Sequence, residues 1–352
     1  MKIFFSKQNT EVCKGIAVLL LLWHHLYYMH PECGWFVYHI AVYAKVCVHI
    51  FLILSGYGLF CSMRKRELNS KLKNENEFGK LFVFYKSRFL SLMPKYWIIF
   101  VLGVSISMVF FHKMPEDVFK KTSHPWIYLL LQFFGLHMIK NRGYGYNPTW
   151  WYMSTIIMLY VVFPYIYKLI SEYPMTAFVG LSLYFLYRPD IPAVGNWGGP
   201  FVLGVFLAKI MDDCSSTGRL KNVRLQMALA IGGGASIIII FSVVPFLKTS
   251  FRMVWMTALG LEVIILGYFL EKINWFSNAL AFIGRHSYNI FLLHTFINFW
   301  LLFKFIYKFR SSPLWSLPLL LSLSLVCSII VECIYGCIAH GIDRLKKQNN
   351  RL

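Results

Sequence analysis

The sequence predicts an all-α, polytopic integral membrane protein with about ten transmembrane helices and both termini in the cytoplasm. Hydrophobic residues make up 58% and aromatic residues 18% of the 352 residues, whereas only 14% are charged. The hydrophobic residues gather in long runs, and the basic residues collect mainly in the short segments between those runs. So little polar surface is typical of a protein that is solvated by lipid rather than by water.

The formal net charge of +20 is explained by the same arrangement. Lysine and arginine are enriched in the cytoplasmic loops of membrane proteins, so basic segments between apolar runs indicate topology. We therefore expect a lipid bilayer, and no nucleic acid, among the partners. The eight cysteines show no paired C-x-x-C spacing and lie mostly in or beside apolar runs, so we expect neither a disulfide framework nor a metal site.

Eleven apolar runs are candidate helices, and spanning a bilayer takes about 20 residues. Eleven crossings would put the termini on opposite sides, yet the basic segments at 64–88 and 341–352 both belong in the cytoplasm. The run at 126–139, about 14 residues long, fits a re-entrant or interfacial helix, which leaves ten spans. Eleven spans stay open as the alternative, because ten spans leave basic residues between 113 and 142 outside. In chain order the runs cover 12–30, 40–61, 88–111, 126–139, 150–167, 175–188, 199–211, 226–247, 252–270, 287–308 and 314–340.

These elements form one predicted transmembrane domain, residues 1–340, followed by a basic cytoplasmic tail, residues 341–352. Two histidines interrupt the first run and no small-residue cleavage site follows it, so we interpret it as the first span and not as a signal peptide. The largest segment expected outside is 112–149, and a second, rich in proline and glycine, is 189–198.

The first run carries three ionisable side chains, Lys14, His24 and His25. An ionisable group inside a membrane helix is costly, so each is a candidate for function. Lys14 and His25 are eleven residues apart, and a helix that turns about 100° per residue returns them to one face, about 16 Å apart along its axis. His24 points about 100° away, where it either tunes His25 or caps another polar contact.

Lys14-Gly15-Ile16-Ala17, with His25 after it, opens an ordered series of motifs along the chain. The series resembles the acyltransferase 3 family of membrane acyltransferases, and this first segment is similar to the first-helix motif of that family. Apolar helices match one another easily, so the order of the whole series carries the resemblance. The segments that follow in the same order are Phe51 to Tyr57; Tyr85 to Arg88 with Leu92, Pro94 and Tyr96; Trp151 to Met153 with Tyr160, Phe163 and Pro164; Phe201 to Ala208; and Ile283 to Tyr288, leading to His294.

The sequence departs from the family at two positions. Lys14 stands where the family usually has an arginine, which keeps the positive charge but loses the planar fork that binds an anion through two hydrogen bonds. Ile156 stands five residues after the central tryptophan, where many members carry a glutamate. The second departure removes one candidate catalytic carboxylate and resembles the branch of the family that lacks it.

The resemblance implies an O-acyltransferase of the bacterial cytoplasmic membrane that uses acetyl-CoA from the cytoplasm and no metal. Its acceptor would be a hydroxyl of a cell-surface or lipid-linked carbohydrate. Such a transfer needs a base for the hydroxyl proton, and we assign His25 to that role with His24 beside it, since an imidazole titrates near pH 6.5. Lys14, Lys86 and Arg88 are the candidates for binding the phosphates of the donor, although topology alone would also place Lys86 and Arg88 in the cytoplasm.

Four further residues are candidates for binding the acceptor. Three of them could instead have a purely structural role. Trp151 either stacks on a sugar ring or belongs to an interfacial aromatic belt. Ser55 and Tyr57 either line a polar tunnel or belong to a segment that serves close helix packing. His294 is placed near the reaction cavity by the family pattern.

Two carboxylates, Glu262 and Glu332, fall inside apolar runs. Because an unpaired carboxylate is costly there, we expect each to pair with a buried cation such as Lys95 rather than to act in catalysis. A transporter or flippase of a polysaccharide intermediate is the alternative function, although the sequence lacks the internal repeat that many transporters have. A membrane scaffold is a third possibility, but it gives no reason for the placement of Lys14 and His25.

Overall fold

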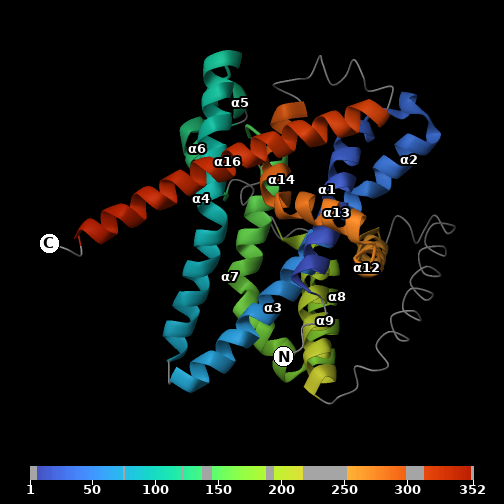
Figure 1. The fold of residues 1–352 in the computed structure, drawn as a ribbon, viewed down its shortest axis with the longest axis vertical. Coiled ribbons are helices and arrows are strands. Elements are labelled where there is room, and N and C mark those ends of the chain that lie inside the picture. The colour runs from blue at the N-terminus through green and yellow to red at the C-terminus, as the bar shows by residue number, and fades with distance from the viewer. Residues whose placement is uncertain are drawn as a thin grey trace. The chain divides into compact units, whose positions relative to one another are not determined.

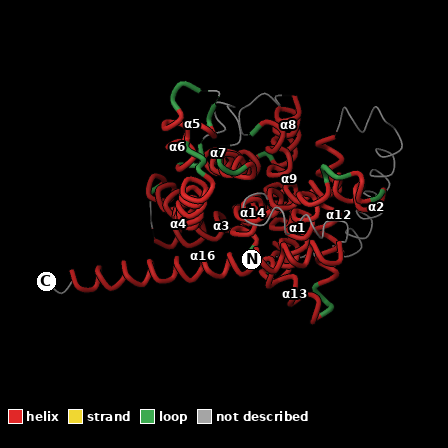
Figure 2. Tube along the Cα trace, turned by 90° about the horizontal axis from the view of Figure 1, so that it is seen from above, coloured by secondary structure: helices red, strands yellow, loops and turns green. Residues whose placement is uncertain are grey.

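The computed structural model describes residues 6–73, 76–120, 122–136, 145–187, 194–216, 252–298 and 313–349. Every regular element in these ranges is a helix, as Figure 1 and Figure 2 show, so the all-α prediction is confirmed for the described chain. The chain divides into two compact units, each made of two separate stretches. Unit 1 is Met1–Tyr85 with Thr155–Arg285, and unit 2 is Lys86–Ser154 with His286–Leu352.

Unit 1 contains the first helices of the chain and a second group from its middle. Two helices are divided between the units: α4 (Glu77–Phe111) contributes its first turns to unit 1, and α7 (Trp151–Glu172) contributes its residues from Thr155 onward. The other elements of unit 1 are α1 (Lys7–Tyr27), η1 (Pro31–Cys33), α2 (Trp35–Tyr43), η2 (Ala44–Val46), α3 (Cys47–Lys73), α8 (Pro174–Tyr187), η5 (Gly195–Trp197), α9 (Gly198–Ser216), α12 (Arg252–Leu270) and α13 (Asn274–Arg285).

Unit 2 contains most of α4, the first residues of α7 and the C-terminal helices. Its remaining elements are α5 (Pro115–Val118), α6 (Pro125–Phe133), η4 (Pro148–Trp150), α14 (Ser287–Phe296) and α16 (Pro313–Asn349). This division into compact units does not test the prediction of one domain over residues 1–340, which stays a prediction.

Helix α1 begins at a capping box and packs among four other helices of unit 1. The backbone N–H of Asn9 donates to Oγ of Ser6 over 2.9 Å, and the N–H of Ser6 donates to Oδ1 of Asn9 over 3.0 Å. This exchange satisfies backbone donors that have no partner within the helix. Beyond it, α1 contacts α2, α3, α12 and α13. A membrane helix enclosed in this way can carry ionisable side chains that face protein instead of lipid.

Glycines bring α1 and α13 together backbone to backbone. A β-carbon at Gly15 of α1 would overlap the carbonyl oxygen of Leu280, and one at Gly284 of α13 would overlap the carbonyl oxygen of Glu11. Small residues at helix crossings are the usual way in which membrane helices approach closely, because lipid provides no hydrophobic drive for association. The crossing sets where α1 lies within unit 1.

A second crossing of the same kind joins α3 and α9. A β-carbon at Gly56 would overlap the carbonyl oxygen of Phe201, and one at Gly204 would overlap the carbonyl oxygen of Ile53. Each helix therefore supplies one glycine to the contact, as α1 and α13 do.

Five helical segments among the described residues are long and apolar enough to cross a membrane: Trp35–Asn69, Phe78–Phe111, Pro148–Glu172, Arg252–Leu270 and Leu314–Ile342. Helix α1, predicted as the first span, is 21 residues long, but its polar and charged residues leave it outside this group. Helix α6, inside the run at 126–139, has only nine residues and is too short to span, in line with a re-entrant or interfacial segment. The total of ten spans stays a prediction, since the run at 226–247 and the end of the run at 287–308 lie outside the described residues.

The C-terminal helix extends further than the sequence analysis expected. Helix α16 runs from Pro313 to Asn349, so the predicted basic tail at 341–352 begins within a continuous helix. Residues 342–349 contain no proline or glycine, and arginine, leucine, lysine and glutamine all favour helix. The change from apolar to basic residues therefore does not end the helix.

Candidate active site

The two residues predicted to share a face lie on one unbroken helix. Lys14 and His25 both belong to α1, which is helical from Lys7 to Tyr27 and contains no proline. Their separation of eleven positions therefore corresponds to about 16 Å along the axis, with the two side chains on the same side. Both side chains are half-buried.

His24 is held at the end of α2. Its Nδ1 lies 2.7 Å from the carbonyl oxygen of Ala41, which is among the last four residues of α2, whose carbonyls lack partners within their own helix. Because a carbonyl only accepts, Nδ1 carries the proton, and Nε2 is the accepting nitrogen of the neutral ring. The His24 ring also stands at 78° to the ring of His25, with 5.1 Å between the centroids. His24 thus caps a polar group, one of the two roles that the sequence left open, and it also contacts His25.

Lys14 is spaced one turn from Glu11, but the carboxylate of Glu11 is engaged by other cations. Its Oε2 lies 3.3 Å from Nη1 of Arg285 on α13, and its Oε1 lies 3.8 Å from Nζ of Lys7. No carboxylate in the part of the chain that the structure describes lies at ion-pair distance from Lys14. Glu11 is nonetheless within electrostatic range of Lys14. Binding of an anionic donor by Lys14 stays a prediction.

Two cations that the sequence analysis did not single out lie near the histidines. Lys45 of η2 and Arg252 at the start of α12 are both within electrostatic range of His24. The Lys45 ammonium lies 5.9 Å from the ring centre of Trp197, and the same ring stands at 65° to buried His49 with 5.4 Å between centroids. Lys45 is isolated in an apolar run, and Arg252 stands at the start of another, so neither belongs to one of the long basic segments that the sequence analysis used.

Ser55 and Tyr57 flank the glycine of the α3–α9 crossing. Gly56 contacts the backbone of α9, which favours the helix-packing interpretation of this segment. Tyr57 is buried and Ser55 is half-buried. A role for these two side chains in binding the acceptor stays a prediction.

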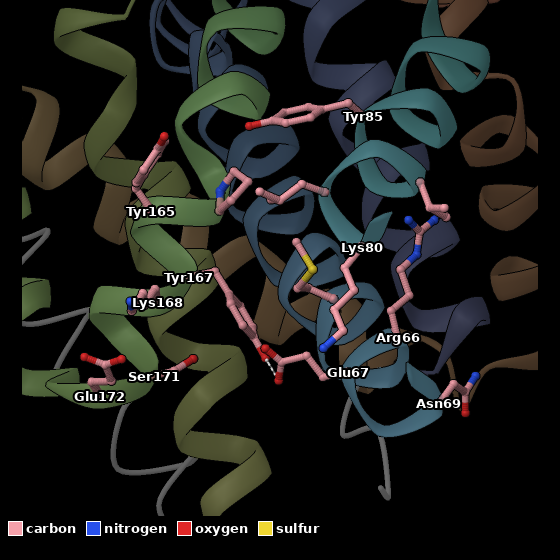
Figure 3. Close-up of a pocket in the computed structure, with 14 residues that line it drawn as sticks. Arg66, Glu67, Asn69, Lys80, Tyr85, Tyr165, Tyr167, Lys168, Ser171 and Glu172 are labelled. Atoms are coloured by element: carbon pink, nitrogen blue, oxygen red, sulfur yellow. Dashed lines mark hydrogen bonds between the residues drawn. The ribbon is translucent and has the colours of Figure 1, made fainter. Parts of the chain in front are cut away.

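A pocket of about 550 Å³ lies at the C-terminal end of α3. Residues from α3, from the first turns of α4 and from the second half of α7 line it, as Figure 3 shows. This volume is within the range of about 300–1,000 Å³ that is typical of small-molecule sites. The polar and aromatic side chains that face it include Arg66, Lys80, Lys168, Tyr85, Tyr165 and Tyr167.

The other predicted site residues belong to unit 2. Lys86 is exposed, and Arg88 is half-buried with Nη2 donating to Oγ of Ser87 over 3.1 Å. Trp151 begins α7 and is half-buried. His294 is fully buried in α14, where its Nδ1 lies 3.0 Å from the carbonyl oxygen of Ile290 one turn earlier. Their roles in binding donor or acceptor stay predictions.

A buried polar network in unit 2 was missed by the sequence analysis. Asn147, just before η4, accepts hydrogen bonds at Oδ1 from the hydroxyls of Thr149 and Thr295, both over 2.7 Å. The indole of Trp150 donates to the carbonyl oxygen of Leu292 over 3.1 Å. Trp150 therefore ties η4 to α14. The Asn-Pro pair that precedes it is a helix-start signal that could have indicated this.

The structure confirms the pairing expected for one intramembrane carboxylate. Oε1 of Glu332 lies 2.6 Å from Nζ of Lys95 and accepts a further hydrogen bond from Nδ2 of Asn289 over 2.9 Å. Glu262 is half-buried in α12 and has no hydrogen bond or ion pair with a described residue. The pairing prediction thus holds for Glu332 alone.

A family model described as an acyltransferase domain matches residues 8–333, which is nearly the whole chain. The chain belongs to the acyltransferase 3 family. Neither a curated protein nor a solved structure gave a significant match. Membership of the acyltransferase 3 family implies acyltransferase activity, and the apolar helices indicate a multi-pass membrane protein. The family membership therefore favours an enzyme over the transporter and scaffold alternatives.

The segments that resemble acyltransferase 3 motifs meet in pairs within unit 1. The first-helix segment contains Gly15 and the segment from Ile283 contains Gly284, the two glycines of the α1–α13 crossing. The second-helix segment contains Gly56, and the segment from Phe201 contains Gly204, the two glycines of the α3–α9 crossing. Glycine in these four motifs therefore has a direct packing role.

Proposed function

We propose that this protein transfers an acyl group, most simply acetyl, from cytoplasmic acyl-CoA to a hydroxyl of a cell-surface or lipid-linked carbohydrate. The proposal goes beyond the general acyltransferase activity that the family implies. It requires the cell membrane of a bacterium as the location, with the donor on one side and the acceptor on the other.

The single observation that supports it most is the arrangement of Lys14 and His25 on α1. A cation and an imidazole share one face of an unbroken helix, about 16 Å apart, inside a group of packed helices. An apolar core has no need for either group. A reaction that binds an anionic donor at one level of the membrane and removes a proton at another needs both.

In the proposed reaction, Nε2 or Nδ1 of His25 removes the proton from the acceptor hydroxyl. The oxygen then attacks the thioester carbonyl carbon, and the resulting tetrahedral oxyanion needs nearby positive charge or hydrogen-bond donors. When the intermediate collapses, the carbon–sulfur bond breaks, the acyl group stays on the acceptor oxygen, and the thiolate of coenzyme A receives the proton from His25. His24, held against Ala41, keeps its position beside His25 throughout.

In this proposal the donor is bound through its phosphates and the acceptor through polar and aromatic side chains. Lys14 is the first candidate for the donor, since it stands where the acyltransferase 3 family usually has an arginine, and Lys86 and Arg88 are further candidates. Charge-assisted hydrogen bonds to phosphate are among the stronger contacts available to these side chains. For the acceptor, the candidates are Ser55, Tyr57, Trp151 and His294.

Mass spectrometry of surface glycans from cells with and without the protein tests the proposal. We expect a glycan or lipid-linked sugar that carries an acetyl or other acyl increment only in cells with the active protein. A strain that carries His25→Ala at the same protein level is the matched control, and it should resemble the deletion. Identical glycans in all three strains would contradict the proposed acceptor class.

A further inference from the structure

The pocket at the C-terminal end of α3 has no part in the chemistry assigned above. We infer that it binds the phosphorylated nucleotide of the acyl-CoA donor, an inference that rests on the proposed function. It would hold the adenosine and phosphates at the cytoplasmic end of unit 1, as an alternative to the phosphate contacts proposed above for Lys14, Lys86 and Arg88. The acyl arm would then extend toward α1.

Three cations from three helices line this pocket. Arg66 comes from α3, Lys80 from the start of α4 and Lys168 from α7, as Figure 3 shows. Coenzyme A carries a diphosphate and a 3′-phosphate, so it presents several negative charges close together. Cations brought from separate helices can surround such a group, whereas a run of basic residues on one helix would reach it from one side only.

Two carboxylates in the pocket wall, Glu67 and Glu172, reduce this charge but are fewer than the three cations. Glu67 is already engaged, because its Oε2 accepts the hydroxyl hydrogen of Tyr167 over 2.7 Å and lies 3.6 Å from Nη1 of Arg64. Glu172 is exposed and lies four residues after Lys168 on α7, at the helix end. Arg64 lies outside the pocket wall and also pairs with Asp212 over 3.0 Å, so two carboxylates share its charge. The three lining cations still outnumber the two lining carboxylates.

Aromatic and amide side chains give the pocket a place for the adenine ring of the nucleotide. Tyr85, Tyr165 and Tyr167 line it, and Asn69 supplies an amide that can both donate and accept. Adenine presents a flat face for stacking and a hydrogen-bonding edge, so this mixture of rings, amide and cations fits a nucleotide better than it fits a simple anion. The volume of about 550 Å³ is large enough for a group of this size.

The position of the pocket on α3 also suits the donor. Arg66 lies eleven residues beyond Ser55 on the same helix, which corresponds to about 16 Å along its axis. Ser55 belongs to the stretch of α3 that crosses α9, and α3 also packs against α1, which carries Lys14 and His25. A nucleotide held at Arg66 therefore leaves its long, flexible acyl arm to follow α3 toward the histidines.

Calorimetric titration of the full-length protein in detergent tests the inference, with coenzyme A and adenosine 3′,5′-bisphosphate as probes. We expect Lys80→Gln and Lys168→Gln each to weaken both ligands by about tenfold, as the loss of one charge-assisted hydrogen bond predicts. The matched control is Lys65→Gln, because Lys65 is an exposed lysine on α3 that does not line the pocket. It should bind both ligands as the unaltered protein does.

Equal affinity for coenzyme A in the pocket variants and in the control would overturn the inference. An anionic phospholipid could present similar phosphate chemistry, so binding to vesicles that contain phosphatidylglycerol is measured in parallel. If the pocket variants lose only this vesicle binding, the pocket is a lipid site and the inference is wrong. If the unaltered protein binds no coenzyme A at all, the proposed donor itself fails, which separates this outcome from a misplaced pocket.

Discussion

Gly15 of α1 lies against the backbone of Leu280 of α13, where a β-carbon would overlap the Leu280 carbonyl oxygen. The reciprocal glycine, Gly284, lies against the backbone of Glu11, and the side chain of Glu11 pairs with Arg285 over 3.3 Å. The crossing therefore sits immediately beside Lys14. The crossing fixes the position of α1. The position of α1 in turn sets where the candidate catalytic side chains lie along the helix axis and in which direction they point.

Replacing Gly15 with alanine should destabilise the protein. Alanine is the better helix former by about 1 kcal/mol, but the contact with backbone leaves no side chain to move aside, and overpacking costs about 1–3 kcal/mol. We expect a lower thermal unfolding midpoint in detergent for Gly15→Ala. Gly180→Ala is the matched control, since nothing lies near a β-carbon at Gly180, and it should leave the midpoint unchanged or raise it. A Gly15→Ala protein as stable as the control would show that the crossing can separate freely.

Removing one member of the Lys95–Glu332 pair should cost more than removing both. Breaking a fully buried ion pair costs about 3–5 kcal/mol, and the cost here should be smaller because the two side chains are 26% and 34% exposed. We expect Lys95→Met to lower stability, and Lys95→Met combined with Glu332→Gln to recover part of the loss. Unfolding measured for both single variants and the double variant gives the coupling between them. Strict additivity would mean that the pair contributes nothing to the fold of unit 2.

Topology mapping should place residues 64–86, 212–224 and the C-terminus in the cytoplasm and residues 112–149 and 189–198 outside. The basic segments predict this arrangement, and the short α6 is compatible with a run that does not cross. Reporter fusions after each segment provide the measurement. A cytoplasmic reporter at 140–149 would show that the run at 126–139 crosses the membrane and that the chain has eleven spans.

Lys86→Ala and Arg88→Ala should weaken coenzyme A binding if these residues contact the donor as proposed. Exposed charge contacts with phosphate are sensitive to screening, so the affinity should also fall as salt is raised. Titration at two salt concentrations measures both effects. Two variants with the affinity of the unaltered protein would leave Lys86 and Arg88 with a topological role alone.

Part of the candidate site could be predicted from the sequence because two inferences needed little information. One needed only the geometry of a single helix, and the other needed only the free-energy cost of an unpaired charge in a membrane helix. Lys14 and His25 share a face whenever their helix is continuous, and α1 is continuous. Glu332 was expected to find a cation because an unpaired carboxylate is costly in any membrane helix, and Lys95 is that cation. Neither inference required knowledge of the tertiary structure.

The rest depended on which helices become neighbours. An apolar pattern shows that a helix has a buried face but not which helix covers it, so the contact between Gly15 and Leu280 could not be predicted. The pocket was missed for a related reason. Its cations Arg66 and Lys80 belong to the basic segment at 64–88, which the sequence analysis interpreted as a topology signal. Lys168 is distant from that segment in sequence, so nothing in the sequence joined it to the other two.

The central claim is that α1 carries the reaction through Lys14 and His25. Acyl transfer from labelled acetyl-CoA to native acceptor in membranes, at matched protein levels, tests it most directly with four variants. His25→Ala should lower the rate by about 10²–10⁴-fold, as loss of a general base does, while Lys14→Arg keeps substantial activity and Lys14→Ala loses it. His24→Ala should be milder than His25→Ala. A fully active His25→Ala protein would contradict the account, and a His24→Ala protein that is the less active of the two would move the base to the histidine held by Ala41.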